Sequence, residues 1–544
     1  MTKLVQFTAF LFIFFSIESV YSQISFGGEP VSFKIDNLSM DVPEISLPKI
    51  DNNSLIQEDI LNADKGNPMR VGVVHNVNYT MDNSGRMDIL NDGARIWRAE
   101  FISSDAITMD VHFSDFVIPE SAELYVYTSD HSFVLGKFTS KNSMEGNVFY
   151  TQDLPGEDII IEYYEPAGVP FKGSFAINKI GHAYRDFLGF KGHWGNAQGD
   201  CHLNVTCPEA AAWINQVNSV VCIKLTVDGA TYLCSGAMVN NVRQDKTPYV
   251  LSAEHCYEAD ASWMFYFNYQ TNTCESTVGV YNRSAAGAVL RAKGNNSQSS
   301  DFLLLEITGA ISPTIQNNLY FAGWDNASTV PTVGACIHHP GGDYKKISFP
   351  RLVNAGGTSY TYFWKVGWIL GDDNKGVTEE GSSGSPLFNA NKLIVGDLCC
   401  GSSACDQPEG YDYYGKFSRS WTNGSTTNNA AKLKPWLDPD NSGASSINGI
   451  YYDGSVGVEE ISSVPNKLDI YPNPTTGEVT INNDFGYSSS DCNIYNLLGN
   501  LVYSRKFDAS QELFLNLNNL ADGIYFIKVV NNNNVYTSKL VIAR

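Results

Sequence analysis

The sequence predicts an all-β protein made of β-rich parts, and three observations support this. Short apolar or alternating runs of about four to eight residues, typical of strands, recur along most of the chain. Gly, Asn, Pro and Ser separate these runs, as in turns between antiparallel strands. The 544 residues, 43% hydrophobic and 12% aromatic, are enough for about two to four packed domains.

The first 22 residues predict a signal peptide. Lys3 gives a positive start, the run from Phe7 to Ile17 is apolar, and Val20 and Ser22 are small residues before a cut near Ser22. This run is short for a membrane helix, which needs about 18 apolar residues, and no later run reaches that length. We therefore expect an exported chain with no membrane span after signal removal.

Charge and cysteine placement narrow the function classes. The formal net charge of −22 argues against general nucleic-acid binding. Ten of the eleven cysteines lie between Cys201 and Cys405, and Cys492 stands alone. Clustered cysteines in an exported chain predict disulfides, and their spacing lacks the Cys-x-x-Cys blocks of structural zinc sites.

Residues 23–191 form the first predicted part. Residues 23 to about 70 look irregular, and strands are expected at Ile107–Phe113, Leu124–Tyr127 and Asp158–Tyr163. This part has no cysteine and no evident catalytic cluster. Because it precedes a cysteine-rich domain in an exported chain, we interpret it as a pro-region that assists folding or blocks activity. The alternative is an accessory binding domain.

Residues 192–449 form the cysteine-rich middle domain. Its short strands and frequent turn residues favour an antiparallel sandwich or barrel, with a short helix at Asn429–Trp436. The expected strands are Val220–Val227, Tyr249–Ala253, Trp263–Tyr269, Phe302–Ile307, Lys392–Leu398 and Tyr413–Phe417.

A polar linker at residues 450–465 leads to a last part, residues 466–544. The pattern there predicts a small β-sandwich. Its expected strands are Glu478–Ile481, Asn493–Tyr495, Ile524–Val530 and Lys539–Ile542.

The turn Gly381-Ser382-Ser383-Gly384-Ser385-Pro386 is the first candidate for chemistry. A serine in such a turn can attack a carbonyl while backbone N–H groups hold the oxyanion. Alone, the string is weak evidence, and an ordinary loop is the default interpretation. His255, at the end of an apolar strand, and Asp301, before another, would supply the base and the group that orients it. The order His, Asp, Ser is that of chymotrypsin.

In combination, these and other motifs give the middle domain a resemblance to the lysyl endopeptidases, secreted bacterial serine proteases. The resemblance covers about residues 192–449, nearly half of the chain. The similar stretches are Cys201–Cys207 with Pro208-Glu209, His255-Cys256, Ser300-Asp301-Phe302, Phe321–Asp325, Ile337–Pro340, Gly376–Glu379, Gly381–Pro386 and Trp436–Pro439.

The resemblance implies a chymotrypsin-like double β-barrel with the triad in the cleft between the barrels. It implies that Ser383 is the nucleophile, His255 the general base and Asp301 its orienter. The backbone N–H groups of Gly381 and Ser383 would form the oxyanion hole. No cofactor and no metal ion is required, although a structural calcium ion stays open.

The resemblance also bears on specificity. Asp412 matches the acidic residue at the base of the family's primary pocket, where it would receive a Lys or Arg side chain. A departure lies beside it, since Cys399 and Cys400 stand where the family has His and Gly. A side chain at position 400 would narrow the pocket, so selectivity for Lys over Arg stays open.

Six cysteines pair by the family's spacing: Cys201 with Cys405, Cys207 with Cys274, and Cys234 with Cys256. The other four middle-domain cysteines, Cys222, Cys336, Cys399 and Cys400, allow three pairings that the sequence does not decide. Adjacent strand residues face opposite sides. We therefore expect two separate bridges rather than one between Cys399 and Cys400.

Position 382 holds Ser and not the Asp that pairs with a new N-terminus in many trypsin-like zymogens. Activation would then mean removing the inhibitory pro-region. The glycine-rich stretch at residues 187–199 suits a processing cut. A cut after Lys191, by the protein itself, would fit the Lys preference.

The end of the chain has a second resemblance. Tyr471–Gly477, then Ile494–Asn496 and Gly523–Lys528, are similar to the C-terminal sorting domain of the type IX secretion system. Such domains direct export across the outer membrane and are usually removed. The alternative for this segment is a fibronectin-like adhesive module.

Together these observations predict a monomeric, secreted or cell-surface serine endopeptidase that cleaves proteins or peptides after Lys. Whether it also cleaves after Arg is left open. Its expected partners are such substrates and the type IX machinery. Two alternatives remain: a glutamyl endopeptidase, against which Asp412 argues, and a surface-binding protein on an inactive protease fold.

Overall fold

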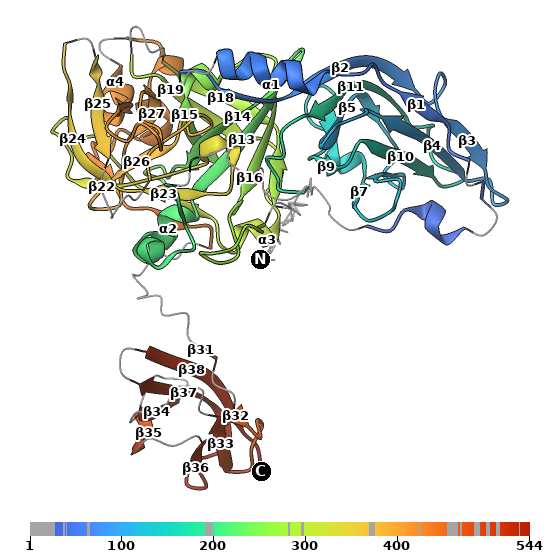
Figure 1. The fold of residues 1–544 in the computed structure, drawn as a ribbon. Helices are drawn as coiled ribbons and strands as arrows, with labels where there is room; N and C mark the ends of the chain where they lie inside the picture. Colours follow the sequence, from blue (N-terminus) through green and yellow to red (C-terminus); the bar gives the residue numbers. More distant parts are fainter. Residues whose placement is uncertain are drawn as a thin grey trace, which may run out of the picture. The chain divides into compact units, whose positions relative to one another are not determined.

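The protein is described here from a computed structural model (Figure 1). It describes residues 28–544 except 36–37, 40, 63–65, 191–198, 200, 281–282, 295–298, 359, 369–375, 424–425, 454–465, 468–469, 483–489, 497–500, 508–511 and 532–533. The expected signal peptide and the expected cut after Lys191 lie outside these residues. No described helix is long and apolar enough to span a membrane. The chain divides into two compact units, Met1–Gly457 and Val458–Arg544.

The N-terminal region of the first unit is a β-sandwich, and its strands belong to two sheets. One sheet contains β1 (Glu44–Ser46), β3 (Arg86–Ile89), β4 (Arg95–Ile102), β6 (Glu123–Tyr127), β7 (Val134–Phe138) and β10 (Asp158–Glu165). The other contains β2 (Met69–Thr80), β5 (Thr108–Val117), β8 (Phe149–Tyr150), β9 (Leu154–Pro155) and β11 (Ser174–Ala183).

Alternation along these strands builds the core of the sandwich. Trp97 and Phe101 of β4 and Met109, Val111 and Phe113 of β5 are buried in one apolar cluster between the sheets. Residues at alternate positions of a strand share a face, so each strand presents one apolar face to the other sheet. The strands expected near 107, 124 and 158 correspond to β5, β6 and β10.

Two largely antiparallel sheets form the middle of the chain. The first contains β13 (Val220–Thr226), β14 (Ala230–Met238), β15 (Tyr249–Ala253), β16 (Ser262–Phe267), β17 (Ser284–Ala286), β18 (Ala288–Lys293) and β19 (Phe302–Ile307). The second contains β12 (Leu203–Asn204), β21 (Trp324–Asp325), β22 (Val333–His338), β23 (Lys346–Ser348), β24 (Pro350–Gly356), β25 (Tyr360–Trp368), β26 (Pro386–Asn389), β27 (Ile394–Gly401), β28 (Tyr411–Lys416) and β29 (Ser446–Ile447).

These two sheets share an apolar core, which explains why they meet face to face. Leu251 and Leu304 of the first sheet pack in the same buried cluster as Ile337, Phe388 and Ile394 of the second. The chymotrypsin-like, all-β fold class expected from the sequence is confirmed. The short pair β20 (Tyr320–Phe321) and β30 (Ile450–Tyr451) closes the domain.

Helices are short in the described residues. The α-helices are α1 (Asn52–Leu61), α2 (Ile214–Val217), α3 (Pro313–Gln316), α4 (Phe417–Thr422) and α5 (Lys434–Leu437). The 3₁₀ turns are η1 (Val31–Lys34), η2 (Ser140–Asn142), η3 (Pro208–Trp213), η4 (Glu254–Cys256), η5 (Pro340–Gly342) and η6 (Asn429–Ala431). The helix expected at Asn429–Trp436 is thus a 3₁₀ turn followed by α5.

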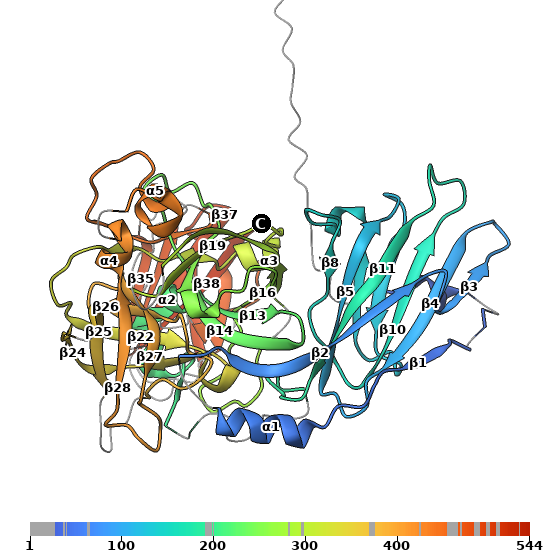
Figure 2. The ribbon, with the colours of Figure 1, turned by 90° about the horizontal axis from the view of Figure 1, so that it is seen from above.

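Strand β2 joins the N-terminal sandwich to the middle domain. One edge of β2 pairs with β11, and residues Met69–Val73 on its other edge pair antiparallel with β14, Ala230 opposite Val73. Figure 2 shows β2 running from one group of strands to the other. The N-terminal region is therefore joined to the first middle-domain sheet by the strand pairing of β2 with β14.

Helix α1 corrects the expectation that residues 23 to about 70 are irregular. Asp51 caps the helix by accepting from the Ser54 backbone N–H, at 3.2 Å. At its other end, Asp59 accepts from Arg70 and Arg185, both at 2.7 Å. Helix α1 has no buried residue, so no apolar period marks it in the sequence, and tertiary ion pairs hold it instead.

Two buried histidines tie α1 to the sandwich and predict a pH effect. His182, 1% exposed, contacts Ser103 Oγ at 2.7 Å and Asn52 Oδ1 at 2.9 Å. Burial, and then the neighbouring His75, lower the pKa of His182 to about 4. The unfolded chain takes up this proton near pH 6.5, so the contribution is complete above pH 6.5 and declines as the pH falls towards 4.

We expect the full-length chain to lose up to about 3 kcal/mol of unfolding free energy from His182 alone between pH 6.5 and 4. Denaturant unfolding of the Ser383→Ala chain at several pH values measures this loss. His182→Gln should flatten the slope, and the exposed His131→Gln serves as the matched control. An unchanged slope in His182→Gln would contradict the assignment.

The C-terminal unit is a separate small β structure. One sheet contains β31 (Asn466–Lys467), β34 (Ser490–Asn496), β35 (Leu501–Phe507), β37 (Gly523–Asn531) and β38 (Asn534–Ile542), and the other β32 (Ile470–Tyr471), β33 (Glu478–Asn482) and β36 (Glu512–Asn516). Ile481, Ile494, Leu515 and Ile527 pack in a common core. The four strands expected here are present as β33, β34, β37 and β38, and β31, β32, β35 and β36 add to them.

Candidate active site

His255 and Asp301 are brought together by two neighbouring strands. β15 ends at Ala253 and delivers His255 in η4, while Asp301 directly precedes β19, and Ala253 pairs with Phe302. His255 Nδ1 lies 2.7 Å from Asp301 Oδ2, and the His255 backbone N–H donates to Oδ1 at 3.2 Å. The Asp301 side chain is fully buried, so its charge acts on the imidazole with little screening.

The backbone at Asp301 is itself unusual. Its φ of 58° is a left-handed conformation that costs energy for a residue other than glycine. The Asp301 carbonyl accepts from the Glu254 N–H at 2.7 Å, which helps to hold this conformation. The strained turn aims both carboxylate oxygens at His255.

The turn that carries Ser383 lies between the two sheets. Ser235 of β14 donates its backbone N–H to the Ser383 carbonyl at 2.8 Å and its hydroxyl to the Gly381 carbonyl at 2.9 Å. Gly384 packs so tightly against Ser252 and Ala253 that a Cβ there would clash. The serine turn is therefore built against the strand that ends at His255.

Among the described residues, His255 Nε2 is buried and has no hydrogen-bond partner. A neutral imidazole whose Nδ1–H donates to a carboxylate presents Nε2 as an acceptor. Its lone pair is thus available for a proton from a nucleophile in the adjoining turn. This is the chemical arrangement required of a general base.

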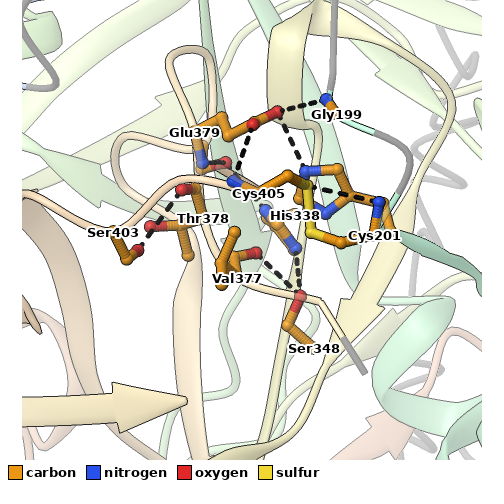
Figure 3. Close-up of a disulfide and its surroundings, with 11 residues drawn as sticks. Gly199, Cys201, His338, Ser348, Val377, Thr378, Glu379, Ser403 and Cys405 are labelled. Carbon is orange, nitrogen blue, oxygen red and sulfur yellow. Dashed lines mark hydrogen bonds and ion pairs between the residues drawn. A yellow bond between two sulfur atoms is a disulfide. The ribbon is translucent and has the colours of Figure 1, made fainter. Parts of the chain in front are cut away.

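Side chains that the sequence did not single out fix the shape of the Ser383 turn. His338 Nδ1 lies 2.7 Å from Ser382 Oγ, and its Nε2 lies 2.9 Å from Ser348 Oγ, which in turn donates to the Val377 carbonyl at 2.8 Å. Figure 3 shows His338, Ser348 and Val377 in this network. Ser382 replaces the usual Asp with a neutral contact, so the turn needs no ion pair to hold its shape.

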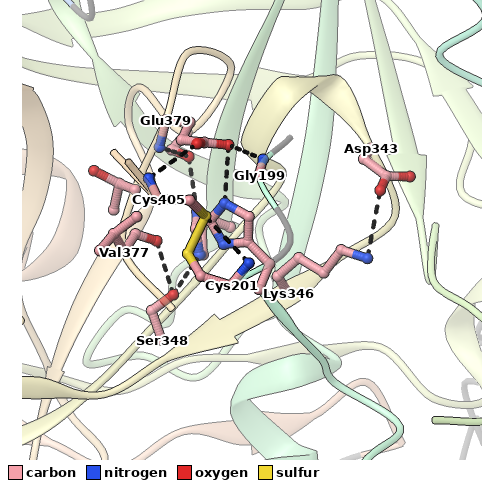
Figure 4. Close-up of polar contacts among 12 residues, drawn as sticks. Gly199, Cys201, Asp343, Lys346, Ser348, Val377, Glu379 and Cys405 are labelled. Atoms are coloured by element: carbon pink, nitrogen blue, oxygen red, sulfur yellow. Dashed lines mark hydrogen bonds and ion pairs between the residues drawn. A yellow bond between two sulfur atoms is a disulfide. The ribbon is translucent and has the colours of Figure 1, made fainter. Parts of the chain in front are cut away.

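A disulfide supports the same turn from the other side. Glu379 accepts from the Gly199 N–H at 3.0 Å and the Cys405 N–H at 3.3 Å and lies 2.9 Å from His202 Nε2 (Figure 3). Burial would raise the pKa of Glu379, but His202 and these N–H groups hold it below its ordinary value. Figure 4 shows the Lys346–Asp343 ion pair, at 3.4 Å, in the same region.

The described residues contain three disulfides, Cys201–Cys405, Cys207–Cys274 and Cys234–Cys256. They are the pairs that the family resemblance implies. Cys234–Cys256 attaches the residue after His255 to β14. The potential metal-binding group formed by Cys201, His202 and Cys405 has its two sulfurs in the first of these disulfides, so they are not available as thiolate ligands.

Asp412 of β28 is buried under four hydrogen bonds. Its carboxylate accepts from Trp368 Nε1 at 2.7 Å, Thr378 Oγ1 at 2.6 Å, the Ser403 N–H at 3.3 Å and also the Ser403 hydroxyl. These donors carry no formal charge, and they fix the orientation of the carboxylate.

The structure corrects the expectation for the remaining cysteines. The described chain does not contain the two separate bridges: none of Cys222, Cys336, Cys399 and Cys400 takes part in a disulfide. Moreover, Cys399 Sγ lies only 2.9 Å from Cys400 Sγ. The register of β27 against β28 shifts between Leu398 and Cys400, so the strict alternation on which the expectation rested does not hold there.

A cavity of about 420 Å³ adjoins the histidine. The middle domain contributes His255, Glu258 and Glu380 to its lining, and the N-terminal region contributes Asn67, Pro68, Met69 and Arg70 among others. The segment that leads into β2 is therefore a wall of this cavity.

Comparisons with known proteins agree with the motifs. Residues 195–415 match the family model of the lysyl endopeptidase C-terminal domain, and residues 469–543 match that of the secretion system C-terminal sorting domain. A lysyl endopeptidase of Pseudomonas aeruginosa is 28% identical over 303 residues, which are 50% of this chain and 61% of that protein. The sorting-domain match assigns the chain to secretion or the cell surface.

Three further likenesses are local or weak. An ulvan lyase of Nonlabens ulvanivorans is 40% identical over 89 residues, 16% of each chain. The crystal structure of protease Anisep from Arthrobacter nicotinovorans is 16% identical with a TM-score of 0.28 and covers 37% of this chain and 90% of its own. A Glu endopeptidase structure is 17% identical with a TM-score of 0.26, covering 40% and 93%.

The two model matches, the Pseudomonas relative and the agreement of their ranges with the motifs lead to one conclusion: residues 195–415 are similar to the C-terminal domain of lysyl endopeptidases, and residues 469–543 are similar to secretion-system C-terminal sorting domains.

Proposed function

We propose that the protein is a secreted serine endopeptidase that cleaves after Lys. Cleavage after Arg is a second activity that the pocket does not exclude. The observation that carries the proposal is His255, with Nδ1 bonded to buried Asp301 and Nε2 without a partner in the described chain. The Ser383 turn adjoins its strand.

In this proposal Ser383 Oγ attacks the substrate carbonyl while His255 Nε2 takes the hydroxyl proton. Asp301 stabilises the imidazolium that forms and keeps Nε2 directed outward. The N–H groups of Gly381 and Ser383 receive the oxyanion. His255 then protonates the leaving amine, and a water molecule releases the acyl group from Ser383 by the reverse sequence.

The test uses purified, processed protein with chromogenic peptides that end in Lys, Arg or Glu. Cleavage after Lys that disappears in Ser383→Ala is the expected result. Cleavage after Glu alone would instead support the glutamyl endopeptidase alternative. No cleavage of any peptide by folded, processed protein would favour a binding protein on a protease fold.

Asp412 is expected to set the preference for a cationic side chain. Asp412→Asn keeps the size but removes the charge and one acceptor, so kcat/KM for a Lys peptide should fall at least about a hundredfold. Asp440→Asn, in an exposed ion pair with Arg243, should leave it unchanged. Unchanged Lys selectivity in Asp412→Asn would refute the pocket assignment.

We also propose that residues 23–191 act as a pro-region. The support is the pairing of β2 with β14 and the position of residues 67–70 on the cavity that contains His255. Removal of this region would open the cavity to substrate. The cut after Lys191, by the protein itself, remains a proposal; N-terminal sequencing of the Ser383→Ala chain tests it, because normal processing there rules out self-cleavage.

The sorting domain would pass the chain to the type IX machinery and then be removed, which leaves a monomeric mature enzyme at about residues 192–449. Substrates are then proteins or peptides outside the cell. Size-exclusion chromatography of the secreted product measures both the mass and the oligomeric state.

A further inference from the structure

Two adjacent cysteines of β27 face each other at the edge of the candidate site. Cys399 Sγ and Cys400 Sγ are 2.9 Å apart. A disulfide S–S bond is about 2.0 Å long, so the two sulfurs need to approach by only about 1 Å to bond. The two sulfurs can therefore bond without any large movement of the backbone.

The local backbone explains this unusual contact. In a regular strand, neighbouring side chains point to opposite faces. Here Leu398 pairs with Tyr414 and Cys400 pairs with Tyr413, so Cys399 is an extra residue on its strand. Such a bulge redirects a side chain and is common beside active sites, and in this case it turns both thiols towards each other.

The pair lies next to the carboxylate of the candidate pocket. Cys399 is 1% exposed, and the contact with Cys400, together with burial, raises the pKa of its thiol. Cys400 is more exposed, and the next residue, Gly401, pairs with Asp412. A change at the two sulfurs therefore acts on the strand segment that adjoins the pocket.

We propose that Cys399 and Cys400 form a reversible vicinal disulfide that controls the adjacent catalytic site. The exported chain meets disulfide-forming conditions, and its three other disulfides depend on them. The oxidant is a small-molecule or protein disulfide. Cys400, the more accessible thiol, attacks it and forms a mixed disulfide; Cys399 then attacks Cys400 Sγ, and the oxidant leaves as two thiols carrying the two protons.

This disulfide should be easier to reduce than the others. Adjacent Cα atoms are about 3.8 Å apart across a trans peptide, which is less than the usual disulfide range of about 4.4–6.8 Å. The Cys201–Cys405 and Cys234–Cys256 pairs, by contrast, have Cα separations of 5.5 Å and 6.5 Å. Strained disulfides are the labile ones in proteins.

Oxidation closes a small ring in β27 directly before Gly401, which pairs with Asp412. The ring constrains the backbone beside the pocket carboxylate, whereas the two thiols leave it unconstrained. We expect oxidation to lower kcat about tenfold in the processed enzyme. This effect on turnover rests on the proposed protease function, whereas the sulfur chemistry does not.

Differential alkylation tests the bond itself. Purified full-length Ser383→Ala protein is denatured with N-ethylmaleimide, then reduced and labelled with iodoacetamide, and each cysteine is read by mass spectrometry. Oxidised protein should carry iodoacetamide on Cys399 and Cys400 but maleimide on Cys222 and Cys336. Maleimide on Cys399 and Cys400 after oxidation, or iodoacetamide on Cys222 or Cys336, would overturn the proposal.

Mild reductant should then convert Cys399 and Cys400 to maleimide-labelled thiols while the three other disulfides stay closed. Loss of those disulfides at the same reductant concentration would contradict the claimed lability. This labelling result is independent of any activity, so it can stand or fall separately from the proposed function.

Activity supplies the second readout. Oxidant should lower kcat of the parent enzyme and of Cys222→Ala, a buried thiol outside the site, and reductant should restore it. Cys399→Ser and Cys400→Ser, each of which removes one sulfur of the pair, should not respond. An oxidant response that persists in Cys400→Ser would refute control by this pair.

Discussion

Asp301→Asn is expected to lower kcat by about four orders of magnitude with little change in KM. The reason is the 2.7 Å contact between His255 Nδ1 and Asp301 Oδ2. An amide NH₂ at this position would donate to Nδ1 and thereby shift the imidazole proton to Nε2. The nitrogen that should accept the serine proton would then be blocked.

Steady-state kinetics on a Lys peptide measures this effect. Asp438→Asn is the matched control, because Asp438 is also buried but caps the Ser442 N–H, at 2.7 Å, elsewhere in the domain. It should retain kcat within about twofold. Nearly full kcat in a folded Asp301→Asn enzyme would contradict the role assigned to Asp301.

Lys224→Met is expected to destabilise the precursor by about 3–5 kcal/mol. Lys224 belongs to β13 of the middle domain, and its Nζ lies 2.8 Å from Asp110 and 2.6 Å from Asp153 of the N-terminal sandwich. All three are buried. Burial alone would lower the pKa of Lys224, but the two carboxylates raise it. A charged lysine is therefore enclosed between the N-terminal sandwich and the middle domain.

Removal of Lys224 leaves two buried carboxylates without their cation. The stability lost in this way is larger than the stability that the intact ion pairs contribute. Denaturant unfolding of the Ser383→Ala precursor measures the loss. Lys179→Met, whose partner Asp228 is exposed, should cost less than about 1 kcal/mol. Adding Asp110→Asn and Asp153→Asn to Lys224→Met should recover part of the stability; a Lys224→Met precursor as stable as the parent would refute the argument.

Much of the fold follows from local pattern. Alternating and apolar runs predicted β5, β6 and β10 of the sandwich and β13, β15, β16, β19, β27 and β28 of the middle domain, because a strand with a buried face must alternate or be apolar throughout. The pattern of apolar residues did not predict helix α1, because Asp59 of this helix contacts Arg70 and Arg185 and not an apolar core. Long-range ion pairs leave no period in the sequence.

The candidate site was likewise predicted only in part from the sequence. His255, Asp301 and Ser383 were predicted from strand ends, chain order and the family resemblance, and their catalytic roles remain predictions. Ser235 and His338 were not predicted as supports of the serine turn. A serine in a buried strand carries no signal of its own, because its role depends on which loop from the second sheet packs against it.

The sequence by itself determined that this is an exported, all-β chain with a lysyl endopeptidase domain and a sorting domain, since composition, periodicity and motifs are local properties. Only the tertiary structure decided that β2 extends the middle-domain sheet, that Lys224 is enclosed by two aspartates of another region, and that Cys399 and Cys400 face each other. Each depends on register or packing between distant segments, and a one-residue bulge in β27 was enough to reverse the prediction made from strand alternation.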